Sequence, residues 1–170
     1  SYPAIPRSYI QQGGYTGLNR AKQMSPEELI AEIKKSGLRG RGGGAFSTGA
    51  KLELLSRRIG EEHFLVCNFD EGEPGTFKDR TIIEKNPHVL LEGIAIAALA
   101  AETDHVFIYL RVEYSYLLPY LQKAIDSAQC VGVFTNLKIN IRLGAGAYVC
   151  GEETALLSSL EGKRGEPRFR

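Results

Sequence analysis

The run Phe64–Phe69 (FLVCNF) decides the fold, because it is short, apolar and followed at once by a polar loop, as expected of a buried strand. Two more strand-like runs lie downstream, at His105–Leu110 (HVFIYL) and Lys138–Leu143 (KINIRL). The third alternates polar and apolar residues, which places it nearer an edge of the sheet. Helical patterns separate the runs, so the sequence predicts an α/β fold with a mostly parallel sheet and helices on its faces.

Start and stop signals mark the intervening helices. Asn86–Pro87 opens an alanine-rich helix, whose apolar run Ile94–Ala101, extended backward by Val89–Leu91, is too short to span a bilayer. The last helix runs over Gly151–Leu160 and stops at Gly162. The helix before the third strand carries four apolar residues on one face, namely Leu117, Leu121, Ile125 and Ala128.

Upstream of the first strand, Ser25–Glu28 predicts a helix start with a capping serine, proline at the first helical position and glutamate three residues after the cap. Gly37 predicts its end, and a short helix from about Gly49 to Arg58 follows a glycine-rich loop. Residues 1–24 are rich in Gly, Pro, Gln and Tyr without a clear period. We expect them to form an N-terminal arm, a lead-in to one domain over residues 25–170.

Charge and cysteine usage exclude several classes of protein. The net charge is +1, so neither nucleic acid nor an anionic membrane is expected as a partner. Cys67, Cys130 and Cys150 are not spaced as Cys-x-x-Cys, which argues against a disulfide framework, a zinc site or an iron–sulfur cluster built from this chain alone. We therefore expect a reducing, cytoplasmic location without a signal peptide or membrane insertion.

The glycine-rich loop at residues 39–49 is the strongest local signal, because glycine lets backbone N–H groups approach a ligand and Arg39, Arg41 and Lys51 supply positive charge for phosphate. With Thr48 as the cap, Lys51 falls in the first helical turn, where an anionic ligand would offset its unfavourable interaction with the helix dipole. A dinucleotide fingerprint is a poor match, since a helix precedes the loop. A Walker A loop would need one residue fewer and Ser or Thr in place of Leu52. The alternative is a tight surface turn with solvated charges.

An acidic loop at residues 68–80 follows the first strand, at the sheet edge where open parallel sheets bind ligands. Its carboxylates and amide suit a ribose or ribityl chain, because a carboxylate accepts hydroxyl hydrogen bonds. Asp70, Glu71 and Glu73 are also oxygen ligands of the kind that magnesium prefers. The alternative is a solvated charged loop neutralised by Lys78 and Arg80.

A third loop, residues 144–154 (GAGAYVCGEET), follows the third strand and opens a helix. Its small residues allow a flat ligand to approach, and Tyr148 is placed to pack on it. Glu152 and Glu153 suit a helix N-terminus, and at least one of them is explained by that alone. Together the three loops predict a site for a nucleotide with a phosphate at one end and a polyol elsewhere, a description that FMN meets without being singled out.

Three long motifs, Gly37–Lys51, Val66–Arg80 and Gly144–Arg168, resemble the NADH-binding, FMN-containing subunit of respiratory complex I and its relatives, among them the flavin subunits of NAD-reducing hydrogenases and some formate dehydrogenases. The resemblance covers the chain from about Ser25 to its end and implies a Rossmann-like, three-layer domain. Gly72 and the string YLRVEYSYL (Tyr109–Leu117) are more similar to the diaphorase subunit of soluble NAD-linked hydrogenases.

The resemblance also implies a set of binding residues, none of them a catalytic acid or nucleophile. FMN would be bound by Gly40, Arg41, Gly42, Lys51, Asn68, Asp70, Glu71, Gly72, Tyr148, Gly151, Glu152 and Glu153. NAD(H) would be bound by Gly43, Gly44, Phe46, Glu73 and Glu153, with Phe46 against the adenine and Glu73 at the nicotinamide. The implied reaction is hydride transfer between NAD(H) and FMN.

By the same resemblance, electrons pass on to iron–sulfur clusters in partner subunits or in a four-cysteine 4Fe-4S domain that lies beyond this chain. Departures from the family pattern, such as Phe69 for a small residue and Val112 for glycine, keep open a non-catalytic module for subunit assembly. A magnesium-dependent phosphotransfer enzyme is the third reading, and the imperfect Walker loop counts against it.

Overall fold

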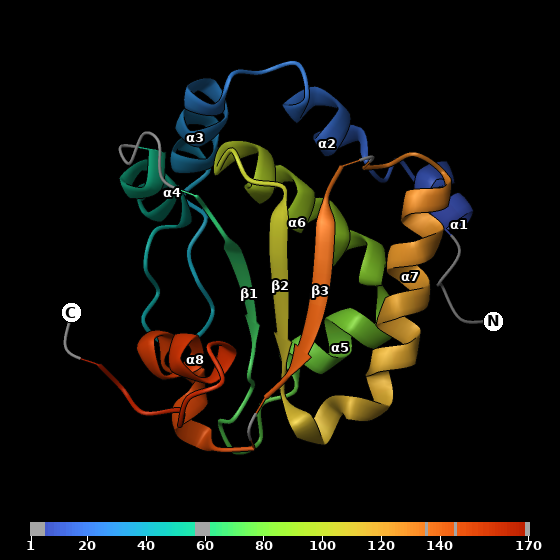
Figure 1. Cartoon of the computed structure of the whole chain (residues 1–170). Helices are drawn as coiled ribbons and strands as arrows, with labels where there is room; N and C mark the ends of the chain where they lie inside the picture. Colours follow the sequence, from blue (N-terminus) through green and yellow to red (C-terminus); the bar gives the residue numbers. More distant parts are fainter. Residues whose placement is uncertain (1–5, 57–61, 135, 145, 169–170) are drawn as a thin grey trace.

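The computed structural model describes residues 6–56, 62–134, 136–144 and 146–168. Its strands are β1 (Leu65–Phe69), β2 (His105–Leu110) and β3 (Lys138–Leu143), in the order β1-β2-β3 with both neighbours parallel. Cys67, Ile108 and Ile141 lie side by side in the register. The parallel sheet that the sequence predicted is confirmed, and the alternating third strand does lie at an edge (Figure 1).

Helices flank the sheet and connect its strands. They are α1 (Pro6–Gln11), α2 (Thr16–Ala21), α3 (Pro26–Lys35), α4 (Thr48–Ser56), α5 (Lys78–Lys85), α6 (Pro87–Ala100), α7 (Leu118–Cys130) and α8 (Glu153–Leu160), with 3-10 turns η1 (Val112–Leu117) and η2 (Tyr148–Gly151). The expected end of the second helix at Arg58 lies outside the described residues. None of the helices in the described part of the chain has the length and apolar character to cross a bilayer.

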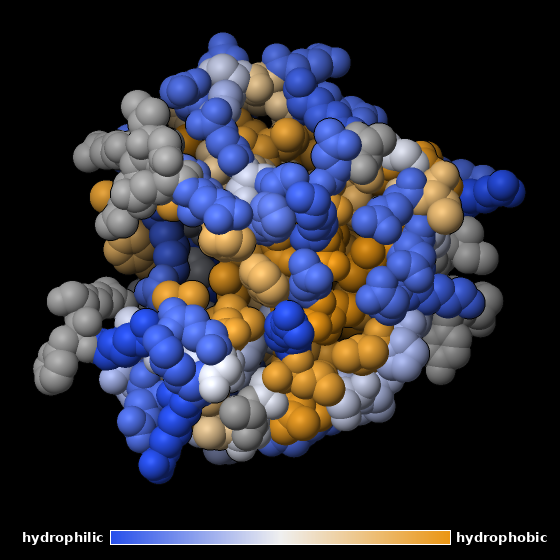
Figure 2. Space-filling model, in the orientation of Figure 1, coloured by the Kyte–Doolittle hydropathy of each residue, from blue (hydrophilic) through white to orange (hydrophobic). Residues whose placement is uncertain are grey.

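Helices lie on both faces of the sheet, but they cover the face toward α6 and α7 more completely than the face toward α8. On one face, Val106, Ile108 and Leu110 are fully buried in the main core, against α6 and α7. On the other face, Tyr109 packs with Leu156 of α8 and donates a hydrogen bond from its hydroxyl to Ser159 Oγ at 2.8 Å. Figure 1 shows α5 and α6 behind the sheet, while Figure 2 shows apolar side chains exposed in the middle of the front face. The layered α/β fold is therefore confirmed.

Residues 6–24 are helical in part and pack against the rest of the molecule. Tyr15 and Leu18 are buried in the main core. The carboxylate of Glu92 on α6 accepts hydrogen bonds from the N–H groups of Tyr15 and Leu18, each at 3.0 Å, and from the Tyr9 hydroxyl at 2.5 Å. Because Glu92 satisfies amides at the start of α2, this short helix depends on a side chain more than 70 residues away in the sequence.

Helix α5, like α1 and α2, is an element that the sequence did not predict. We expected residues 68–80 to form a loop, but α5 begins at Lys78. The preceding residue, Phe77, offers no side-chain hydrogen bond, so the usual start signal is absent. The prediction failed because the first N–H groups of α5 donate to the carboxylate of Glu71, in the preceding loop, and not to a residue directly before the helix.

The local signals around α3 are confirmed. Ser25 and Glu28 form the expected capping box, and Gly37 adopts a positive φ of 69° just after the helix. Asn86 likewise accepts a hydrogen bond from the Val89 N–H at 3.3 Å and begins α6. Helix α3 then packs against α4, which carries the end of the glycine-rich loop.

The contact between α3 and α4 requires a glycine at position 49. A Cβ atom on Gly49 would lie 2.7 Å from the backbone nitrogen and 2.9 Å from the Cα of Lys34, neither of which can move without shifting the helix. We expect Gly49→Ala to lower the free energy of unfolding by about 1–3 kcal/mol. Denaturant unfolding followed by circular dichroism would measure this change.

The matched control is Gly93→Ala in α6, where the added Cβ meets nothing within 4 Å. That variant should be more stable than the parent chain by about 0.5–1 kcal/mol, since alanine loses less backbone entropy in a helix. Equal effects of the two substitutions would show that the α3–α4 contact is not tight.

Candidate functional site

The three loops meet around one cavity of about 830 Å³ at the edge of the sheet where β1 ends. A volume of this size suits a nucleotide-sized ligand. The residues that line the cavity are Gly40, Arg41, Gly42, Gly43, Lys51, Asn68, Asp70, Glu71, Gly72, Glu73, Thr76, Lys78, Asp79, Tyr148, Val149, Gly151 and Glu152. The structure thus brings together residues more than 100 positions apart in the sequence.

The glycine-rich loop is held at its base and open at its tip. The Gly40 N–H donates to the Phe46 carbonyl at 2.9 Å, and the Thr48 N–H donates to the Leu38 carbonyl at 3.0 Å. Between these anchors Gly43 has a positive φ of 91°. Ala45 also has a positive φ, of 46°, a conformation that costs an alanine about 1–2 kcal/mol relative to the right-handed region.

The start of α4 lies one residue earlier than the sequence suggested. Ser47, not Thr48, provides the cap, because its hydroxyl accepts from the Ala50 N–H at 3.3 Å and Thr48 is already helical. Lys51 still lies in the first turn, and its Nζ is 2.6 Å from an Oε atom of Glu153 in α8. This ion pair joins the glycine-rich loop to the third loop and offsets the unfavourable position of the lysine at a helix N-terminus.

Asn68 links the acidic loop to the third loop. Its side-chain oxygen accepts from the Asp70 N–H, and its side-chain nitrogen donates to the Gly151 carbonyl, both at 3.0 Å. Gly151 permits this approach, since a Cβ there would lie 3.2 Å from the Asp70 carbonyl oxygen. The carboxyl end of β1 and the turn before α8 are therefore fixed relative to each other.

Asp70 presents an unsatisfied acceptor at the cavity wall. Its Oδ2 atom is buried and accepts no hydrogen bond from the described residues. Burial raises the pKa of the Asp70 carboxyl, the Arg111 guanidinium acts in the opposite direction, and Glu113 adds a smaller raising effect. A buried polar atom without a partner is costly, so a ligand hydroxyl donated to Asp70 would be favourable.

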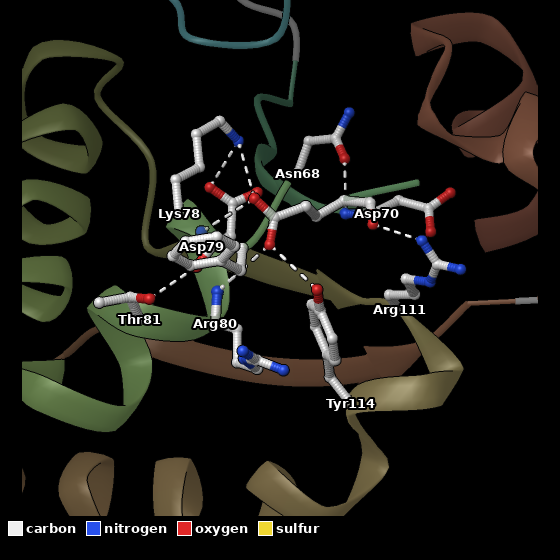
Figure 3. Close-up of polar contacts among 10 residues, drawn as sticks. Asn68, Asp70, Lys78, Asp79, Arg80, Thr81, Arg111 and Tyr114 are labelled. Carbon is white, nitrogen blue, oxygen red and sulfur yellow. Dashed lines mark hydrogen bonds and ion pairs between the residues drawn. The ribbon is translucent and has the colours of Figure 1, made fainter. Parts of the chain in front are cut away.

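Glu71 is the opposite case, because its carboxylate is fully engaged by the protein (Figure 3). The side chain is 1% exposed, and its oxygens accept from the Asp79 N–H at 3.1 Å and the Tyr114 hydroxyl at 3.1 Å. Burial on its own would raise the pKa of Glu71. The hydrogen bonds from Asp79, Tyr114 and Arg80, together with the nearby Lys78 ammonium, outweigh burial and lower this pKa.

The third loop closes the cavity with Tyr148. This side chain is 68% exposed, and its hydroxyl donates to Glu73 Oε2 at 2.6 Å, so the two loops touch at the cavity rim. Gly72 makes room for the ring, since a Cβ there would lie 2.9 Å from Tyr148 Cδ2. Glu152 caps α8 by accepting from the N–H groups of Thr154 and Ala155, each at 2.9 Å. Helix capping therefore accounts for this glutamate, as one of the sequence alternatives proposed.

Most of the residues expected at the site line the cavity, and three do not. Gly44, Phe46 and Glu153 are outside the lining, although Glu153 reaches it through Lys51. Phe46 is 57% exposed on the loop. The structure adds four lining residues, Thr76, Lys78, Asp79 and Val149, which lie within the motifs but were not assigned to the binding site. Three of them lie at or next to the helix start at Lys78, and sequence alone did not reveal that start.

Cys67 and Cys150, the two cysteines beside the loops of the site, are structural. Burial, with a smaller contribution from Asp79, raises the pKa of the Cys67 thiol to about 12, so it is protonated at neutral pH. Cys150 is buried among the side chains that α8 packs on the sheet. In the part of the chain that the structure describes, no three or more His, Cys, Asp or Glu side chains are grouped to hold a metal ion.

A parallel sheet with a glycine-rich, cationic loop and an acidic loop at one cavity defines a nucleotide-binding α/β domain. The Nuo51 FMN-binding domain family matches residues 33–170, and the chain belongs to this family. The resemblance inferred from the three motifs is therefore confirmed, and with it FMN as the cofactor of the family.

Curated relatives agree with this assignment. The chain is 48% identical over 170 residues to a subunit of the NADH-quinone oxidoreductase of Streptomyces coelicolor, covering 95% of this chain and 38% of the relative. It is 44% identical over 201 residues to the corresponding NADH-quinone oxidoreductase subunit of Aquifex aeolicus, covering 100% of this chain and 47% of that protein. The chain thus spans less than half the length of these relatives.

A crystal structure of an NAD+-reducing NiFe-hydrogenase in the H2-reduced state contains a similar chain. The two superpose with a TM-score of 0.79 at 48% sequence identity, over 86% of this chain and 26% of the hydrogenase chain.

Because the pKa of Asp70 is raised, the stability of the folded chain should depend on whether this carboxyl is ionised. An ionised carboxylate whose folded pKa is raised destabilises the folded state above that pKa, and the cost disappears as the pH falls below the ordinary value. We expect Asp70→Asn to raise the melting temperature at pH 7, with the difference narrowing toward about pH 4. Thermal melts at several pH values would measure it.

Asp126→Asn on the exposed side of α7 is the control, and its melting temperature should follow that of the parent chain. A lower melting temperature for Asp70→Asn at pH 7, or a difference that does not depend on pH, would contradict the account of Asp70 given above.

Proposed function

We propose that this chain binds FMN and NADH in the cavity and serves as the site of hydride transfer between them within a larger oxidoreductase. One observation carries the proposal: a cationic glycine-rich loop and an acidic loop, in which Asp70 has a buried carboxylate oxygen without a partner among the described residues, line a single cavity of about 830 Å³ in a member of an FMN-binding family. FMN has both complementary groups, a phosphate and a ribityl chain of hydroxyls.

The charged groups of the cavity favour one orientation of the flavin nucleotide. Arg41, Lys51 and the backbone of Gly40 and Gly42 would hold the phosphate end, since charge-assisted hydrogen bonds to phosphate are strong. Asp70 would accept a ribityl hydroxyl at its free Oδ2 atom. The ring would lie toward Gly72, Tyr148 and Gly151, which line the same cavity. All of the residues in this proposed arrangement were expected at the site from the sequence, and all of them line the cavity.

The NADH end of the site would lie at the rim. Gly43, Gly44 and Phe46 form the exposed tip of the glycine-rich loop, and an exposed phenylalanine is suited to stack on an adenine. Glu73 is available at the rim once its hydrogen bond from Tyr148 is exchanged for one from the nicotinamide carboxamide. Glu152 and Glu153 complete the acidic side of the site. FMN, when bound, supplies the hydride acceptor, and the protein contributes orientation and exclusion of water.

The wider assembly is proposed from the family and its relatives. An NADH-quinone oxidoreductase and an NAD+-reducing hydrogenase both contain a chain of this kind. We therefore propose iron–sulfur subunits as the next electron carriers, in a cytoplasmic or membrane-peripheral complex, with a diaphorase of a soluble hydrogenase as the specific context. A 4Fe-4S cluster would belong to a region of the protein beyond these residues.

The two competing functions receive no support from the geometry. Phe69, which motivated the non-catalytic module, is buried in the main core and does not line the cavity. The carboxylates that suggested a magnesium site have different hydrogen-bond partners. Glu71 accepts from the start of α5 and from Tyr114, while Glu73 accepts from Tyr148. A phosphotransfer enzyme would need these oxygens to converge on one ion.

Binding of FMN to the isolated chain tests the proposal. Titration of FMN with the chain, followed by quenching of flavin fluorescence, should give saturable binding. Lys51→Met should weaken it about 10-fold or more, because a hydrogen bond to a charged group contributes about 1.5–3 kcal/mol. Lys35→Met on α3, an exposed lysine outside the cavity lining, is the matched control and should bind as the parent chain does. Absence of FMN binding by the parent chain would overturn the proposal.

A further inference from the structure

We propose that Glu71 is a positioning residue and not a ligand of the nucleotide: its carboxylate holds α5 and Tyr114 against the acidic loop and thereby sets where Asp70 and Gly72 stand in the cavity. This inference rests on the proposed function, and it changes the assignment of Glu71, which the family resemblance had placed among the FMN contacts. Three features of the structure carry it.

The first feature is the start of α5, which has no cap of its own. Phe77 precedes the helix and makes no side-chain hydrogen bond, so the first amides of α5 need another acceptor. Glu71 supplies one, accepting from the Asp79 N–H at 3.1 Å and from the Arg80 N–H at 3.5 Å. A carboxylate at this position also interacts favourably with the helix dipole. Glu71 therefore does for α5 what an N-cap residue does in an ordinary helix.

The second feature is that the carboxylate has no acceptor capacity left for a ligand. Two carboxylate oxygens offer about four acceptor positions. Four protein groups approach them: the two amides of α5, the Tyr114 hydroxyl at 3.1 Å and the Lys78 ammonium at 3.5 Å. With the side chain 1% exposed, a ligand hydroxyl would have to displace one of these donors. Asp70, the neighbouring carboxylate, has the free oxygen that Glu71 lacks.

The third feature is that the backbone around Glu71 is fixed at the same time. Arg111, at the end of β2, donates from its guanidinium to the Glu71 carbonyl oxygen and from its N–H to the Phe69 carbonyl oxygen at 3.1 Å. The Gly72 N–H turns back to the Asp70 carbonyl oxygen at 2.9 Å. Figure 3 shows Arg111 and Tyr114 approaching the acidic loop, with Asp79 and Arg80 of α5 beside it. Loosening the side chain of Glu71 would therefore free the loop from α5 and Tyr114, and leave it held by Arg111, by Asn68 and by the contact of Glu73 with Tyr148.

A variant of Tyr114 can distinguish a positioning role of Glu71 from direct contact between Glu71 and the ligand. Its hydroxyl donates to Glu71 Oε2, and the residue does not line the cavity. If Glu71 acts by position, removing the Tyr114 hydroxyl must weaken FMN binding as well. If Glu71 is itself a ligand, the Tyr114 hydroxyl should matter little. Tyr116 offers a matched control on the same 3-10 turn, since its hydroxyl donates to Glu84 at 3.2 Å on the exposed surface.

The experiment compares four variants with the parent chain: Glu71→Gln, Tyr114→Phe, the double variant Glu71→Gln/Tyr114→Phe, and Tyr116→Phe. FMN affinity is measured by fluorescence quenching, and amide hydrogen exchange of residues 70–73 and 79–80 is measured without ligand. We expect Glu71→Gln to weaken FMN binding about 10-fold and Tyr114→Phe about 3-fold to 5-fold. The double variant should resemble Glu71→Gln, because residues that act through one contact are not additive.

Hydrogen exchange in residues 70–73 should accelerate in both single variants, while Tyr116→Phe should leave both measurements unchanged. Weakened binding in Glu71→Gln alone, with Tyr114→Phe like the parent, would make Glu71 a direct ligand and overturn the inference. Lower melting temperatures with unchanged FMN affinity would overturn it too, by reducing Glu71 to a purely structural residue. If the parent chain binds no FMN, the proposed function fails, and unchanged exchange in residues 70–73 of Glu71→Gln would then overturn the positioning role separately.

Discussion

Parallel pairing of the three strands is the constraint on which the site depends. Because parallel strands all end at the same edge, the loops after β1 and β3 must emerge at that edge, however far apart they are in the sequence. Asn68 then joins these two loops through the Gly151 carbonyl. The glycine-rich loop arrives from outside the sheet, and the Lys51–Glu153 ion pair brings it to the same edge. If β1 and β3 ran in opposite directions, the loops after them would emerge at opposite edges of the sheet and could not line one cavity.

The charges of the cavity fall into two groups with different purposes. Some are satisfied within the protein: Glu152 caps α8, Glu71 caps α5, and both shape the walls without offering a free oxygen. The Oδ2 atom of Asp70, in contrast, accepts no hydrogen bond from the described residues, and Arg41 lines the cavity from the glycine-rich loop. A buried acceptor without a partner costs stability, and such a cost is maintained at binding sites because the ligand offsets it. The distinction between the groups cannot be made from residue type, since all of the carboxylates look alike in the sequence.

The family assignment and the physical description of the cavity support each other. Family membership rests on residues 33–170, and the cavity is built from the three segments that carried the resemblance. The structure also shows which departures from the family pattern matter for the cavity. Phe69 is buried in the core and Val112 is 37% exposed at the start of η1, so neither of them lines the cavity. The chain spans less than half of its curated relatives, so the assembly around this domain is inferred from them.

The sequence by itself determined the three strands, the capping box of α3, the start of α6 and the three ligand loops. These features depend on interactions within a few residues, so their pattern is visible in the order of the amino acids. Only the tertiary structure decided what the acidic side chains do. Glu71 caps a helix that starts seven residues later, and Glu92 satisfies the start of α2 from 74 residues away. Such partners are chosen by how the chain folds back on itself, and no local pattern in the sequence records that choice.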